Sequence, residues 1–397
     1  MSECHALRFP SEVPLPENTQ TVELPKQAYD ACKKFEAFAE QVDTPAPSIG
    51  APLSTRARFM GYLILETPLE SSRETIAKEI LDCSTNEDIA EIAQQYIDRF
   101  ACCFRNNRTH LFPTSNDPSS RPPVSSGINH LRWLQEDRPE EVRVKTKARA
   151  LHRDRHCCLI TGAQDISIFD EHSPLSQGHG GSLNPRKTST HPTHILSRPK
   201  KKGHTVQPAD DSGPEVNTLF WSFVRIIPQL HFYMFDAWIW VMLRFGGIDV
   251  VNELNEENIH KLDNVLTLDR NVHASYSSLQ TWLEAMVKLF LYESDFPVIN
   301  LQQSTPDKYT VKTLHPYQQH DIKDNPITFT SSDPNNFPVP SPTYLGLHAA
   351  IARVFHLSGA EAYISRVTRN LHRIGTLASD GSSADVLRYV LSQVSLF

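Results

Sequence analysis

Glycine is scarce in this chain, with 15 residues among 397 against 28 prolines, and this balance excludes collagen-like proteins. The sequence also lacks an excess of positive charge. Its 39 Lys and Arg residues face 46 Asp and Glu residues, a formal net charge of -7. The molecule as a whole is therefore not a cationic wrapper of nucleic acid, and any phosphate binding must be local.

Cysteine pairs and long apolar runs are also missing. The seven cysteines are odd in number and contain no C-x-x-C spacing, which argues against a disulfide scaffold and against a four-cysteine zinc site. The most apolar stretch, residues 216–247, is interrupted by Arg225, Asp236 and Arg244, and the uncharged runs between them are too short for a bilayer span. Residues 1–10 show no secretory signal. We expect an intracellular protein of the nucleus or cytoplasm with no membrane partner.

Periodicity and composition predict a predominantly helical α+β protein in three parts. Residues 1–128 are predicted to be a helical N-terminal region that ends in a linker rich in Pro and Ser. Residues 143–292 carry the motifs described below and include a helical insertion at 200–250. Residues 293–397 are predicted to be a C-terminal loop and helical region.

Several elements are predicted individually. Ser84 and Glu87 have the spacing of a capping box at the start of a helix that reaches residue 100. A second amphipathic helix is predicted over residues 279–291, and a hairpin or edge strands over 308–314 and 326–330. Three C-terminal helices follow in the prediction, over 344–358 with its end at Gly359, then 360–375 and 383–395.

Short motifs occur in a fixed order along the predicted central domain. CLITG at 158–162 is followed by THILSRP at 193–199, DNVLTL at 263–268 and finally His273, with Asp269 placed to cap the helix that carries His273. This order predicts strand, strand, helix. It resembles the HNH endonuclease family, specifically its divergent fungal branch, over about residues 145–397. The resemblance implies a ββα-metal module with a long helical insertion.

The resemblance also implies metal-dependent endonuclease activity on nucleic acid, with DNA ahead of RNA. His194 would be the general base, because an imidazole titrates near working pH and can accept a proton from water. His273 would ligate one divalent ion, Mg²⁺, Mn²⁺ or Zn²⁺, through a neutral nitrogen. Asn264 would tie the loop so that the His194 strand and the His273 helix keep their separation.

One position departs from the family pattern. Active members usually carry an acidic or other ligating residue directly before the first histidine, and Thr193 stands there in this chain. The second metal ligand must then come from elsewhere, with His191, Asp170 and Glu171 as candidates.

A basic segment precedes the motifs. Residues 143–156 contain six Lys or Arg and one Asp, a local charge of +5, and a smaller cluster begins at 198. We predict a phosphate-contacting surface rather than a merely solvated helix face. Its predicted nucleic-acid contacts are Arg143, Lys145, Lys147, Arg149, Arg153, Arg198 and Lys200.

Two other functions are consistent with the same residues. A binding or interaction protein that keeps the nuclease scaffold with weakened catalysis would fit Thr193 and the net acidity. A metal-buffering loop would use the dispersed histidines 172, 179, 191, 194 and 204. Taken without the other motifs, His194 would be an ordinary hydrogen-bonded core histidine.

Overall fold

A computed structural model describes residues 15, 23–42, 50–104, 139–169, 186–197, 237–254, 258–286, 307–314, 322, 325–373 and 384–392. The chain forms two compact units, each built from separate segments. The described parts of 109–197 and 254–352 make the first, here called the mixed unit. The described parts of 9–108, 198–253 and 353–397 make the second, the helical unit. The predicted α+β class with helix predominating is confirmed at this level.

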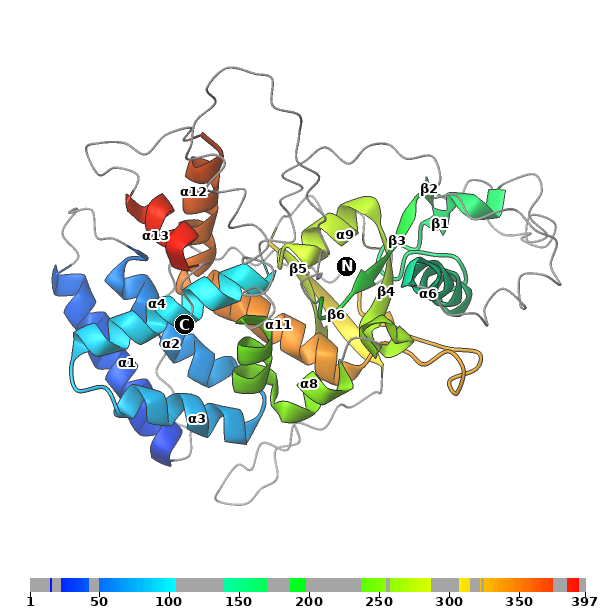
Figure 1. Cartoon of the computed structure of the whole chain (residues 1–397). Helices are drawn as coiled ribbons and strands as arrows, with labels where there is room; N and C mark the ends of the chain where they lie inside the picture. Colours follow the sequence, from blue (N-terminus) through cyan, green and yellow to red (C-terminus); the bar gives the residue numbers. More distant parts are fainter. Residues whose placement is uncertain are drawn as a thin grey trace. The chain divides into compact units, whose positions relative to one another are not determined.

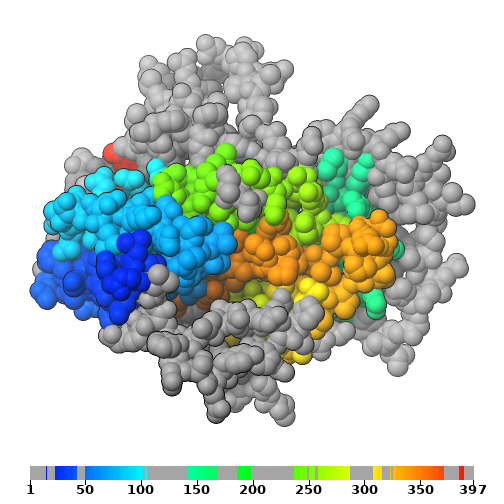
Figure 2. Space-filling model, turned by 90° about the horizontal axis from the view of Figure 1, so that it is seen from below, coloured from blue at the N-terminus to red at the C-terminus, as the bar shows by residue number. Residues whose placement is uncertain are grey.

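The helical unit is built around α1 (Glu23–Val42), α2 (Leu53–Glu66), α3 (Glu70–Leu81) and α4 (Asn86–Phe104). Its C-terminal helices are α12 (Ala360–Arg373) and α13 (Ala384–Ser392). Blue to cyan marks the surface of the first four helices in Figure 2. Phe100 lies at the centre of the core, with its ring 5.5 to 6.1 Å from those of Phe59, Phe245 and Phe355. Burial of these rings and their edge contacts stabilise this unit.

The start of α4 differs from the prediction by one residue. The backbone N–H of Asp88 donates to Thr85 Oγ1 at 3.2 Å, and the Asp88 carboxylate accepts from the N–H groups of Ser84 and Thr85 at 3.1 and 3.0 Å. The reciprocal capping pair is therefore Thr85 with Asp88, and the predicted pair Ser84 with Glu87 was wrong. Both pairs have the same spacing, so spacing alone does not choose between them.

The insertion belongs to the helical unit where the structure describes it. Residues 237–241 are helical, followed by η5 (Met242–Gly246) and α8 (Ile248–Glu253). Trp240 packs on Tyr96 with ring centres 4.6 Å apart, and Arg244 pairs with Glu79. This differs from the predicted division, in which 200–250 stayed with 143–292, because the aromatic side chains of the insertion are covered by α3 and α4. Residues 216–236, part of the predicted helical insertion, lie outside the described ranges.

The mixed unit contains three small sheets and the helices α6 (Pro139–Arg153) and α9 (Arg270–Ser277). Strands β1 (Gln164–Asp165) and β2 (Lys187–Thr188) pair in parallel, with η4 (Ile166–Phe169) after β1. β3 (Thr190–His194) pairs antiparallel with β4 (Val265–Asp269), which follows the short turns η6 (Asn258–His260) and η7 (Leu262–Asn264). Both α6 and α9 pack against the β3–β4 pair (Figure 1). The strand, strand, helix order predicted from the motifs is confirmed.

The predicted helix over 279–291 was wrong in its described part. Residues 281–285 form β5 (Thr281–Ala285), which pairs antiparallel with β6 (Lys308–Thr313). Trp282 and Leu283 are both fully buried, so the strand is covered on both faces. A strand buried on both faces shows no alternation, and its apolar residues can match a helical stripe. Residues 287–291 lie outside the described ranges.

The other C-terminal predictions are confirmed. β6 and β7 (Ile327–Thr328) pair antiparallel, and α11 (Pro342–Ser358) ends before Gly359, whose φ of +83° suits glycine. α12 and α13 follow within two or three residues of the predicted bounds. Among the described helices, none is both long and apolar enough to cross a membrane.

Candidate functional site

The β3–β4 pair and α9 form a strand–strand–helix scaffold with a fixed register. His194 lies opposite Val265, and Thr190 opposite Asp269 at the other end. Asp269 caps α9 as predicted, since its Oδ1 accepts from the N–H groups of Asn271 and Val272 at 2.9 and 3.0 Å. The second carboxylate oxygen accepts from Thr161 Oγ1 at 2.9 Å. One buried aspartate thus joins the 158–162 motif, the end of β4 and the start of α9.

The 158–162 motif is a tight turn rather than a strand. Gly162 N donates to the Cys158 carbonyl at 2.9 Å, with Gly162 at φ +66°. Leu159 N donates to the Thr267 carbonyl at 2.9 Å and holds the turn against β4. The burial of Cys158 raises the pKa of its thiol, which therefore stays protonated and packs as a small apolar group.

Three candidate side chains come together where β3 faces α9. Thr193 Oγ1 lies 2.6 Å from His273 Nδ1, and the rings of His191 and His273 have their centres 5.5 Å apart. His191 and Thr193 are two residues apart in one strand, so they point to the same face. We call His191, Thr193 and His273 the strand–helix cluster.

The hydrogen bonds of Thr193 bear on the tautomer of His273. Thr193 Oγ1 also lies 3.3 Å from the His191 carbonyl, to which only its hydroxyl can donate. With the hydroxyl hydrogen directed to this carbonyl, the Thr193 oxygen accepts from His273 Nδ1–H, and His273 Nε2 carries the lone pair. A neutral imidazole held through its other nitrogen in this way is the usual form of a metal-ligating histidine.

The surroundings of the cluster favour neutral imidazoles. Burial lowers the pKa of His273, and nearby His191 lowers it further. Burial also lowers the pKa of His191, with the charges of Lys147 and Arg270 acting in the same direction. The carboxylates of Asp165 and Asp269 act on this pKa in the opposite direction, so two cations and two anions stand near His191.

His194 has a different environment. Neighbouring strand residues point to opposite faces, so His194 faces away from the side of β3 that carries Thr193. Its Nε2 lies 2.9 Å from Nδ1 of His260 in η6, and the two ring planes are inclined by 61°. The structure thus brings His191 and His273 together and places His194 beside a histidine that the sequence analysis did not select.

Asn264 is fully buried and ties two segments of the chain together. They are not the two segments that the prediction named. Its side-chain Oδ1 accepts from Leu196 N at 3.0 Å, and its Nδ2 donates to the carbonyls of Leu196 and Ile259 at 3.1 and 3.0 Å. Leu196 follows His194 by two residues and Ile259 precedes His260. Asn264 therefore fixes the His194 strand relative to the His260 turn rather than to α9.

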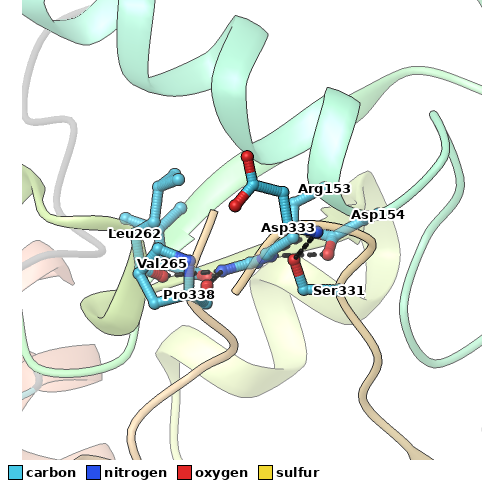
Figure 3. Close-up of polar contacts among 7 residues, drawn as sticks. All are labelled: Arg153, Asp154, Leu262, Val265, Ser331, Asp333 and Pro338. Carbon is cyan, nitrogen blue, oxygen red and sulfur yellow. Dashed lines mark hydrogen bonds and ion pairs between the residues drawn. The ribbon is translucent and has the colours of Figure 1, made fainter. Parts of the chain in front are cut away.

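Arg153 was wrongly predicted as a nucleic-acid contact. Its side chain is 0% exposed and pairs with the Asp154 carboxylate at 2.7 Å (Figure 3). The same guanidinium donates to the carbonyls of Leu262 and Val265, both at 2.7 Å, and of Pro338 at 3.1 Å. A guanidinium with these partners is not accessible to a phosphate. Its function is to fasten α6 to β4 and to the 329–341 segment.

The remaining basic residues differ in accessibility. Lys145 is buried, Lys147 is half-buried, and Arg149 is exposed and donates to the Asn336 carbonyl at 2.8 Å. Arg143 lies in α6, but its side chain is outside the described part. Four other candidates or alternatives, Asp170, Glu171, Arg198 and Lys200, lie outside the described ranges.

Within the described ranges, no three His, Cys, Asp or Glu side chains form a group arranged to hold a metal ion. The two histidines of the strand–helix cluster still suit one ion in part, because imidazoles that share an ion at about 2.1 Å have ring centres about 5 Å apart. Oxygen ligands from water or phosphate would complete such a site, as is usual for Mg²⁺.

Comparisons with protein-family models, with curated proteins and with solved structures found no match.

Sequence analysis missed three residues that the structure places at the site. His260 and Arg270 belong to no recognisable motif, because only the folded turn and the helix start bring them near His194 and His191. Asp165 is the third: its carboxylate accepts from Thr190 N at 2.7 Å and from the Thr190 hydroxyl. The predicted cap at Asp269 marks the helix start next to Arg270, but a cap does not identify a site.

Proposed function

We propose that the mixed unit is a metal-dependent endonuclease that hydrolyses phosphodiester bonds in nucleic acid. The observation that carries the proposal is the approach of Thr193 Oγ1 to His273 Nδ1 at 2.6 Å beside His191. This arrangement brings an imidazole of strand β3 next to an imidazole of the capped helix α9, with the cations Lys147 and Arg270 nearby. Such a site suits a divalent ion and a phosphate together.

His273 and His191 would hold the ion, and Thr193 would orient His273 rather than ligate. The bound ion supplies positive charge that stabilises the charge developing on the phosphate. Lys147 and Arg270 add to this positive potential and draw the phosphate backbone to the same face. The absence of an acidic residue at 193 is then compensated by the imidazole of His191.

His194 would be the general base at the end of β3. It takes a proton from a water molecule, whose oxygen forms a bond to phosphorus as the bond to the leaving oxygen breaks. The leaving oxygen takes a proton from solvent, and His194 returns its proton to solvent. Thr193 and His194 are adjacent and face opposite sides of β3, so the phosphate would have to bind across the end of this strand to be reached by both the ion and the base.

Calorimetric titration with Mn²⁺ tests the metal site directly. The wild-type chain should bind one ion, and His273→Ala or His191→Ala should abolish measurable binding. Thr193→Val should weaken binding by about 10- to 100-fold, because it removes the acceptor that orients His273. Thr188→Val, in the neighbouring strand β2, is the matched control and should bind as the wild type does. Equal affinities in all five proteins would contradict the proposal.

A second function, a nucleic-acid-binding or protein-interaction protein with weakened catalysis, is favoured by one observation. Among the described residues, no three His, Cys, Asp or Glu side chains are grouped so that they could hold a metal ion. Nucleic-acid binding that is independent of Mn²⁺, with no cleavage at any metal concentration, would favour this alternative.

A further inference from the structure

His194 and His260 form a pair of imidazoles whose geometry is that of a hydrogen bond rather than a stack. The two nitrogens are 2.9 Å apart, the ring centres 4.9 Å apart and the planes inclined by 61°. Only one of the two nitrogens can carry the hydrogen of this bond. The contact therefore couples the tautomer of one ring to that of the other.

His260 is held in place from several sides. It ends the single turn η6, where Lys261 N donates to the Asn258 carbonyl at 2.9 Å. The carbonyl of His260 accepts from Thr146 Oγ1 of α6 at 3.3 Å. The carbonyl before it, that of Ile259, accepts from the buried Asn264 amide at 3.0 Å.

The same amide fixes the segment that carries His194. Asn264 Nδ2 donates to the Leu196 carbonyl at 3.1 Å, and Ile195 N donates to the Asn264 carbonyl at 2.9 Å. One buried side chain thus sets both members of the histidine pair.

We propose that His260 is a positioning residue that holds His194 in the tautomer a general base requires. His194 Nε2–H donates to His260 Nδ1, and His194 Nδ1 therefore carries the lone pair that accepts the proton of water. When that proton arrives, the imidazolium keeps its Nε2–H bond to His260, which stabilises the positive charge. This inference rests on the proposed function only for the identity of the proton donor; the tautomer is a property of the pair itself.

Nitrogen-15 NMR of the full chain with labelled histidine side chains tests the pair. The signals of His194 are identified by their loss in His194→Gln. The wild type should show His194 with its hydrogen on Nε2. His260→Ala should give a mixture of tautomers, and His260→Asn should restore the wild-type form because its amide oxygen can accept the same bond. His152→Asn, at an exposed histidine of α6, is the control and should leave the His194 signals unchanged.

Plasmid cleavage in Mn²⁺ supplies the second measurement. His260→Ala should lower kcat by about tenfold or more with KM and Mn²⁺ affinity unchanged, and His260→Asn should recover most of the rate. A hydrogen on Nδ1 of His194 in the wild type, or a His194 tautomer unaffected by His260→Ala, would overturn the inference. Absence of cleavage by the wild type would refute the proposed function instead, and the NMR result would still decide the role of His260.

Discussion

One buried histidine outside the strand–helix cluster, His348, is expected to make the stability of the mixed unit depend on pH. His348 of α11 stacks on Tyr276 with ring centres 3.9 Å apart and planes inclined by 1°, and its Nε2 donates to the Tyr276 carbonyl at 3.2 Å. Burial lowers the pKa of His348 from 6.5 to about 3. The folded state therefore keeps this ring neutral at pH values where the unfolded chain protonates it.

Stability should consequently fall on acidification. Between about pH 6 and pH 3 the unfolded state binds one more proton than the folded state at His348, which costs about 1.4 kcal/mol of unfolding free energy for each pH unit. Above about pH 7.5 the ring of His348 is neutral in both states, so this loss of stability is absent. Urea unfolding at pH 7.5, 6.0 and 5.0 should show a shallower decline for His348→Gln than for the wild type. Parallel declines in the two proteins would show that His348 does not carry the effect.

For single residues, the sequence predicted where the candidate site residues lie better than it predicted the side chains and carbonyls to which they bond. His194, Asn264 and His273 lie on the strand, turn and helix expected for them, and Asp269 caps α9. Their partners were not predictable, because His260 approaches His194 only through the folding of η6. The role of Arg153 was wrong for a related reason. An arginine in a basic segment is readily predicted to contact phosphate. The carbonyls of residues 262, 265 and 338 that bind Arg153 instead lie far along the chain, so the neighbouring sequence does not reveal them.

The helix α6 depends on Arg153 for its attachment to β4. The guanidinium reaches Val265, the residue paired with His194, so it braces the strand opposite the proposed base. Arg153→Met should destabilise the chain by about 3–5 kcal/mol, because the Asp154 carboxylate would remain buried without its partner. Arg149→Met, at an exposed position of the same helix, should cost less than about 1 kcal/mol. Chemical denaturation of both variants measures the difference, and equal costs would contradict the bracing role.

At the element scale, helices with one apolar face were predictable and a doubly covered strand was not. α4, α11, α12 and α13 each have a stripe of helical period, and their predicted bounds are close to the observed ones. In β5, Trp282 and Leu283 are both buried, and apolar residues with this spacing also fit the apolar stripe of a helix. Its partner β6 lies more than twenty residues further along the chain, so local periodicity could not reveal the pairing.

At the scale of the whole molecule, both units are assembled from discontinuous segments. The described part of the 200–250 insertion packs with α3 and α4, while the strands on either side of it, β3 and β4, pair with each other. The sequence predicted the insertion but not where it packs. Its aromatic side chains required apolar partners, and only the fold shows that Tyr96 and Phe100 provide them.

We expect this chain to cleave nucleic acid with a divalent ion held at the strand–helix cluster. Nicking of supercoiled plasmid by the full chain in Mn²⁺, with and without EDTA, tests it most directly. The wild type should relax the plasmid and EDTA should stop it. His194→Ala should cut about 10² to 10⁴ times more slowly while keeping its fold by circular dichroism. An intact plasmid with the metal-loaded wild type, or unchanged cutting by His194→Ala, would contradict the account.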